Sequence, residues 1–158
     1  GVDVLSIVGV GPLTALNLLS ETGRDLSRWR TEKHFTSWLN FAPGTHISGG
    51  RRLSSRRRPG KNRAGLLLRQ AASSVGRTQT ALGAFYRRIA ARRGKAIAIV
   101  ATARKIACAY YRLLRYGGQY VERGAAAADQ AYQQRRLDSL RRQAKTLGYA
   151  LMQSQPVG

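Results

Sequence analysis

A serine followed by two glycines, in the sequence ISGG at residues 47–50, is the first feature that could do chemistry. A serine hydroxyl can attack a phosphodiester if it is exposed, loses its proton to a base and meets positive charge that stabilises the transition state. The glycines would leave Ser48 accessible, and arginines follow directly. The same residues are typical of a plain Ser-Gly-Gly turn, and from the residues alone the turn is the favoured interpretation.

Other residues compete for a role in that chemistry or could assist it. Ser54 and Ser55 lie deeper in the basic run and are alternative nucleophiles. His46 is the one imidazole nearby, two residues before Ser48. Residues two apart in an extended segment point the same way, so His46 is a candidate base.

A block of basic residues follows the glycines and contains no acid. No acidic residue occurs anywhere between Glu32 and Glu122, so neighbouring acids in the sequence cannot balance this charge. Arginine dominates the block, and its guanidinium group binds phosphate in a bidentate manner. We therefore expect phosphate binding, with a solvated loop as the alternative. The block consists of Arg51, Arg52, Arg56, Arg57, Arg58, Lys61 and Arg63.

A second candidate for phosphate contact is the sequence IVGVG at residues 7–11, which precedes a helical pattern. Its spacing fits a helix-hairpin-helix, in which Gly9 and Gly11 let the backbone approach a phosphate in front of a helix N-terminus. Such a module contacts the DNA backbone without reading sequence. An ordinary turn between helices would also use glycine.

The overall charge points to a polyanionic partner. The chain has 158 residues with 28 Lys and Arg against seven Asp and Glu, a formal net charge of +21. Self-repulsion on this scale opposes compaction unless a polyanion is bound. We expect that partner to be nucleic acid and not a membrane, because the chain has no apolar run of about 18 residues. The single Cys108 fits a reducing compartment, and we expect a cytoplasmic, bacterial-type protein that joins the nucleoid when bound to DNA.

The acidic residues do not predict a metal site in this chain. Metal-dependent nucleases need two or more carboxylates that converge on divalent cations, and no pair of the seven acids is spaced to do so. His34 and His46 lack zinc-type companions. No cofactor is therefore expected within these residues.

Apolar spacing predicts a mainly α fold: a helix-hairpin-helix start, a basic loop or short strands, then a small helical bundle and a C-terminal helix. Helices are expected within 12–23, 31–39, 64–75, 82–93 and 99–116, with glycines at several ends. Residues 1–120 should form the DNA-binding and catalytic-serine domain, and 121–158 a linker and terminal helix. Leucines from Leu137 to Leu151 could form a seam for oligomerisation.

The order of these motifs resembles a known family. The segments GVGPLTA (9–15), TEKHFTSWL (31–39), ISGG (47–50), RQAA (69–72) and ALGAFYRR (81–88) are similar to the C-terminal domain of serine-dependent insertion-sequence transposases. Members of that family pair this domain with an N-terminal RuvC-like Asp-Glu-Asp-Asp domain and are guided by a bridge RNA. The resemblance extends from about residue 5 to 120.

The resemblance implies DNA transposition, with a serine nucleophile that maps onto Ser48. It also implies DNA as partner, a guide RNA as a further partner, and association of several copies. Mg²⁺ would be held by the RuvC-like domain, whose carboxylates these 158 residues do not include. Because the sequence starts at Gly1, it is expected to be a domain or truncated copy that is inactive alone. A carboxylate or metal of that domain is the alternative to His46 as base.

The rival hypothesis is a non-catalytic nucleic-acid-binding module, either a helix-hairpin-helix protein or a basic RNA-binding protein. The two hypotheses differ in whether Ser48 reacts with DNA, and in whether the upstream reading frame encodes spaced acidic residues on strands.

Overall fold

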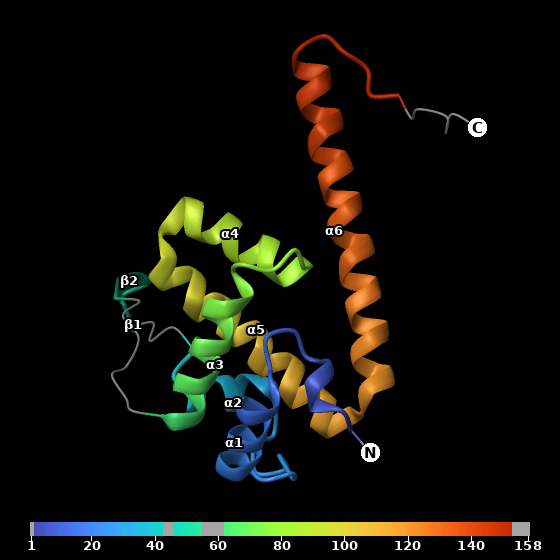
Figure 1. Cartoon of the computed structure of the whole chain (residues 1–158). Coiled ribbons are helices and arrows are strands. Elements are labelled where there is room, and N and C mark those ends of the chain that lie inside the picture. The colour runs from blue at the N-terminus through green and yellow to red at the C-terminus, as the bar shows by residue number, and fades with distance from the viewer. Residues whose placement is uncertain (1, 43–45, 55–61, 153–158) are drawn as a thin grey trace, which may run out of the picture. The chain divides into compact units, whose positions relative to one another are not determined.

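The computed structural model describes residues 2–42, 46–54 and 62–152, which divide into two compact units, Gly1–Gly118 and Gln119–Gly158. The first unit is a helical bundle with one small β-hairpin, so the mainly α prediction is confirmed (Figure 1). Its elements in chain order are the 3-10 turn η1 (Val4–Ser6), α1 (Pro12–Thr22), α2 (Glu32–Trp38), β1 (His46–Ser48), β2 (Arg51–Ser54), α3 (Arg63–Val75), α4 (Ala81–Arg93) and α5 (Lys95–Tyr116).

Helix α5 is the centre of the first unit and packs against α2, α3 and α4. Its inward face is built from small and aromatic residues, of which Ala103, Ala107 and Tyr110 are completely buried. Small side chains let neighbouring helices approach closely, which is how a single helix can contact three others. Gly94 and Gly117 flank the helix with φ of 86° and 81°, a left-handed conformation that favours glycine and stops helices where the sequence predicted.

An aromatic cluster joins α2 to α5. The rings of Trp29 and Phe35 meet edge to face with centroids 4.9 Å apart, and Phe35 is fully buried. The hydroxyl of Tyr111 donates a 2.7 Å hydrogen bond to the carbonyl of Trp29. At the rim Arg112 binds Glu32 through two bonds of 2.6 and 2.9 Å, a bidentate pair that fixes the register of the two helices.

Helix α1 turns a different face inward than the sequence suggested. Apolar spacing puts Ala15, Leu16 and Leu19 on one side of the helix, but Leu16 is 66% exposed while Leu18 is fully buried. The inward face is Ala15, Leu18 and Thr22, which has the proper helical spacing but includes a polar residue. The Thr22 hydroxyl is satisfied there by the Tyr110 hydroxyl at 2.8 Å, so a buried threonine took the place of an expected leucine.

The second unit is dominated by α6 (Gly118–Thr146). The run of four alanines after Gly124, expected to be a linker, lies within this helix, because alanine is the strongest helix former and overrides one glycine. The helix ends at a Schellman motif: Gly148 has φ of 80°, and the Tyr149 N–H donates to the Ala144 carbonyl at 2.8 Å. Leu147 and Leu151 therefore lie beyond the helix, and the predicted leucine seam stops before them.

Candidate nucleic-acid interface

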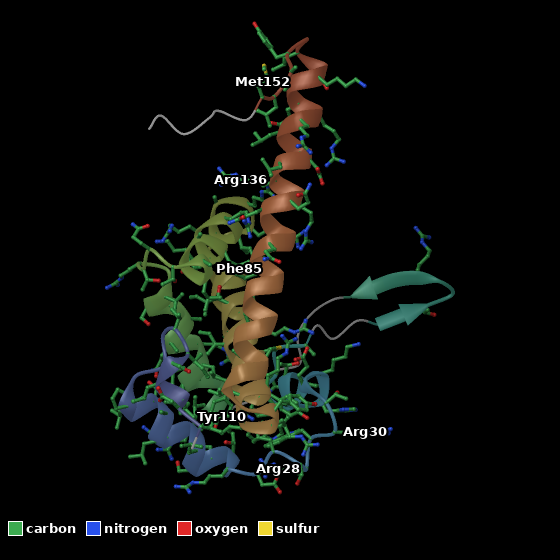
Figure 2. All side chains as sticks on the ribbon, turned by 90° about the vertical axis from the view of Figure 1, so that its right-hand side faces the viewer. Arg28, Arg30, Phe85, Tyr110, Arg136 and Met152 are labelled. Carbon is green, nitrogen blue, oxygen red and sulfur yellow. The ribbon has the colours of Figure 1, made fainter. Side chains whose placement is uncertain are left out.

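The β-hairpin places Ser48 and Arg51 opposite each other. Strands β1 and β2 pair antiparallel (the teal arrows in Figure 2). Ser48 is aligned to Arg51 and Ile47 to Arg52. Gly49 and Gly50 form the two-residue connection with φ of 54° and 73°. Two consecutive positive φ values are the mark of a type I′ turn, which joins twisted strands tightly and favours glycine at both positions. The glycines are therefore explained by the turn itself.

The tip of this hairpin is open. Both Ser48 and Arg51 are exposed, and neither glycine would meet another atom if it carried a β-carbon. Residues directly opposite in an antiparallel pair lie on the same face with β-carbons about 5 Å apart. Ser48 and Arg51 are therefore neighbours across the turn, a relationship that the sequence spacing alone did not specify.

The structure describes only part of the remaining basic block. Arg56, Arg57, Arg58, Lys61 and the rival Ser55 lie outside the described residues, as do the side chains of Arg52 and Ser54. Arg63 is the first residue of α3; its side chain is 73% exposed and lies 3.5 Å from Glu21. An exposed pair of this kind is weak, so Arg63 remains available to another anion.

The two glycines of the 7–11 motif have different surroundings. Gly9 has φ of 89°, and a β-carbon there would collide with Val75 of α3. Gly11 is the N-cap of α1 with an ordinary extended backbone (φ −83°, ψ 171°), and a β-carbon there would meet nothing within 4 Å. Thus Gly9 is required by packing, while nothing in the described residues requires a glycine at position 11.

The expected first helix of a helix-hairpin-helix is, within the described residues, the single 3-10 turn η1. The second helix, α1, begins as predicted with Pro12 in its first turn and no side-chain cap. Its first N–H groups therefore have no side-chain acceptor and lie behind the bare backbone of Gly11. This end of α1 could accept an anion.

Each acidic residue of the first unit has a partner within that unit. Asp3 accepts from the Leu5 N–H, and Glu21 and Glu32 pair with Arg63 and Arg112. Asp25 binds the hydroxyl and N–H of Ser27, and these hydrogen bonds lower the pKa of its carboxyl. These four acids face 22 Lys and Arg within residues 1–118, so most of the positive charge has no carboxylate to pair with.

A further group of basic residues lies on α4, outside the predicted basic block of residues 51–63. Arg88, Arg92 and Arg93 line a groove between α4 and α5. In the sequence, this basic group is indicated only by its spacing of four and five residues in a stretch without acids. The groove itself forms only when α5 packs against α4. Cys108 is half-buried on α5, and burial raises the pKa of its thiol, in keeping with a packing role.

The described residues contain no cluster of three or more His, Cys, Asp or Glu side chains that could hold a metal ion. Among the same residues, no helix has the length and apolar character needed to cross a membrane.

Comparison with known proteins identifies the chain's family. No curated protein and no solved structure matches the chain. The model of one family, described as Transposase IS116/IS110/IS902 family, matches residues 3–87. That stretch includes Gly11, the hairpin with Ser48, and the whole basic block, and it is more than half of the 158 residues. The chain therefore belongs to the IS116/IS110/IS902 family of transposases.

Proposed function

We propose that this transposase chain is the part that binds DNA and supplies the serine that attacks the scissile phosphodiester. The observation that carries the proposal is the pairing of Ser48 with Arg51 across a bare two-glycine turn. A nucleophile must reach phosphorus without steric hindrance, and the equatorial oxygens need positive charge as negative charge develops on them. An exposed serine beside an exposed arginine on one hairpin face meets both needs.

In the proposed step the Ser48 Oγ attacks phosphorus and forms a serine–phosphate ester. The bond from phosphorus to one deoxyribose oxygen breaks, and that oxygen leaves with the bonding electron pair and takes up a proton. The hydroxyl proton of Ser48 passes to a base, either His46 or a carboxylate of a RuvC-like domain. The part of the chain that the structure describes has no acidic cluster to hold Mg²⁺, so the ion would be held by that domain.

Two features would hold the DNA while the serine reacts. The bare end of α1 at Gly11 presents backbone N–H groups to a phosphate, as the second half of a helix-hairpin-helix would. The basic block of residues 51–63 follows the hairpin tip in the sequence and adds several cations. Such contacts are independent of base sequence, so target choice would come from another component, for which a guide RNA is the candidate.

The test is formation of a covalent protein–DNA adduct. The transposase joined to its RuvC-like domain, with Mg²⁺, element-end DNA and guide RNA, should give an adduct that survives denaturant. Ser48→Ala should abolish the adduct and change DNA affinity less than about threefold, because an exposed hydroxyl contributes little to a mainly ionic interface.

Ser54→Ala and Ser55→Ala are the matched controls and should leave the adduct intact. If the adduct persists in Ser48→Ala and disappears in either control, the nucleophile lies inside the basic block. If no adduct forms with any of these proteins while all of them bind DNA normally, the chain is a non-catalytic nucleic-acid-binding module.

A further inference from the structure

A groove lies between α4 and α5, the two helices joined at Gly94. It has a volume of about 270 Å³ and is lined by Arg88, Ile89, Arg92, Arg93, Ile97 and Ala101. The guanidinium groups come from α4, and α5 contributes apolar side chains, of which Ile97 is 50% exposed. All six residues lie beyond the stretch matched by the transposase family.

The segment that forms this groove carries charge of one sign. Residues 81–116 contain nine Lys and Arg and no acid. Two of the nine have structural roles: Arg87 donates to the carbonyls of Gly76 and Thr78, at 3.1 and 2.7 Å, and Arg112 binds Glu32. Arg92 and Arg93 are exposed at the end of α4, where the carbonyl groups of the helix C-terminus offer negative potential.

Phe85 of α4 (labelled in Figure 2) contacts one cation of α4 and one of α5. The Lys105 ammonium of α5 lies 4.4 Å from its ring centroid, and the Arg88 guanidinium lies 5.8 Å from it. An aromatic ring that holds cations in this way limits the positions that they can adopt. Positively charged side chains therefore follow the α4 side of the groove, from the ring of Phe85 to Arg93.

We propose that the α4–α5 groove binds the phosphodiester backbone of a nucleic acid. It would be a second binding surface, separate from the hairpin and from the N-terminus of α1. The groove is open and smaller than the 300 Å³ or more that is typical of small-molecule sites. None of its lining side chains is aromatic, so it offers no platform for stacking bases. Arginines above an aliphatic floor fit phosphates and sugars, a contact that does not read sequence. This binding does not depend on whether Ser48 is the nucleophile.

The experiment compares two double variants of the whole chain that lose the same charge. Arg92→Ala/Arg93→Ala removes two of the three arginines that line the groove, and Arg141→Ala/Arg142→Ala removes two exposed arginines that are consecutive in α6. Alanine favours helix, so both variants should keep their helical circular dichroism. Affinity is measured against salt concentration for a DNA duplex and, separately, for an RNA hairpin.

We expect the groove variant to reduce the slope of log affinity against log salt by roughly 1 to 2 units on at least one of the two probes, since each lost phosphate contact on a duplex removes about 0.9. The α6 control should change the slope by less. Loss on the DNA probe alone or on the RNA probe alone identifies the nucleic acid that the groove holds. Equal slopes for groove variant and control on both probes would overturn the proposal.

A second measurement uses the unaltered chain, so it does not depend on the variants folding. Phenylglyoxal modifies exposed arginines, and peptide mass spectrometry reports the rate at each site. Bound nucleic acid should slow modification of Arg92 and Arg93 several-fold. Rates at these two arginines that are the same with and without nucleic acid would also exclude the groove as a binding surface.

Discussion

Gly9 and Val75 are in such close contact that a β-carbon on the glycine would collide with Cγ2 of the valine. The carbonyl oxygen of Ala71 would lie 3.2 Å from the same β-carbon, so α3 closes over this turn. Gly11, two residues later, has no such neighbour. The two glycines of one motif therefore serve different purposes, and substitution can separate the fold from the proposed DNA contact.

Gly11→Val should weaken binding to all DNA duplexes alike while the fold is kept. Valine tolerates the extended backbone of position 11, so the free energy of unfolding should change by less than about 1 kcal/mol. Its branched side chain would, however, hold a phosphate away from the N–H groups of α1. Fluorescence anisotropy with several unrelated duplexes, beside urea denaturation, measures both effects.

Gly9→Ala is the matched control for that experiment. The left-handed backbone and the collision with Val75 should together cost about 2–4 kcal/mol of stability. Normal DNA binding by Gly11→Val would refute a phosphate contact there. Unfolding of Gly11→Val would instead show that position 11 is needed for the fold.

Much of the fold was predictable because glycines mark where its helices stop. Gly23, Gly94 and Gly117 all have positive φ and follow the last residue of a helix, and apolar spacing located α3, α4 and α5. Apolar spacing gives the wrong inward face for α1 because it counts threonine as polar. Thr22 is nevertheless buried, with its hydroxyl hydrogen-bonded to Tyr110. The start of α6 was expected to be a linker because it contains a glycine, but the four alanines that follow this glycine favour helix more strongly.

The candidate site was predictable in part. Sequence singled out Ser48 from its glycines, but the pairing with Arg51 depends on the hairpin register, which two positive-φ glycines fix. The groove of α4 and α5 was missed because its walls come from two helices, and the approach of two helices leaves no local mark in the sequence.

Triple replacement of Arg56, Arg57 and Arg58 by alanine should make DNA binding less dependent on salt. If about five basic residues of the block neutralise phosphates, the slope on duplex DNA is near −4 to −5, and the variant should lose roughly 2 to 3 units of it. Arg63→Ala should have a smaller effect than any one of the three, because Glu21 already lies 3.5 Å from its guanidinium group. A slope unchanged by the triple replacement would mean that these side chains belong to a solvated loop.

Helix α6 should mediate self-association through Leu137 and Leu140. These leucines are 42% and 41% exposed and, with Ala144, have the three- and four-residue spacing of a coiled-coil seam. Leu137→Lys/Leu140→Lys should lower the mass measured by light scattering, as should deletion of residues 119–158. Leu147→Lys is the control, because Leu147 lies past the end of the helix and should not matter. An unaltered chain that is monomeric at all concentrations would refute the seam.

Alkaline pH should destabilise the fold through Tyr110 (labelled in Figure 2). Burial raises the pKa of its hydroxyl, although the hydrogen bond to Thr22 acts in the opposite direction. Thr22 has one hydroxyl proton, which faces the carbonyls of Leu18 at 2.8 Å and Gly23 at 3.0 Å, so Tyr110 is the donor in the bond between the two hydroxyls. Deprotonation would remove this donor and leave a buried charge between α1 and α5.

The sign of the effect follows from that raised pKa. The folded state holds the proton more tightly than the unfolded chain, so this contribution to stability is fully present below the usual tyrosine pKa of about 10. It is lost as pH rises through the higher pKa of the folded state. Tyr110→Phe should cost about 1 kcal/mol at neutral pH, from the lost hydrogen bond, but should lose less stability than the unaltered chain above pH 10. Urea denaturation across pH 7 to 11 measures both, and parallel stability curves for the two proteins would show that Tyr110 does not cause the alkaline loss.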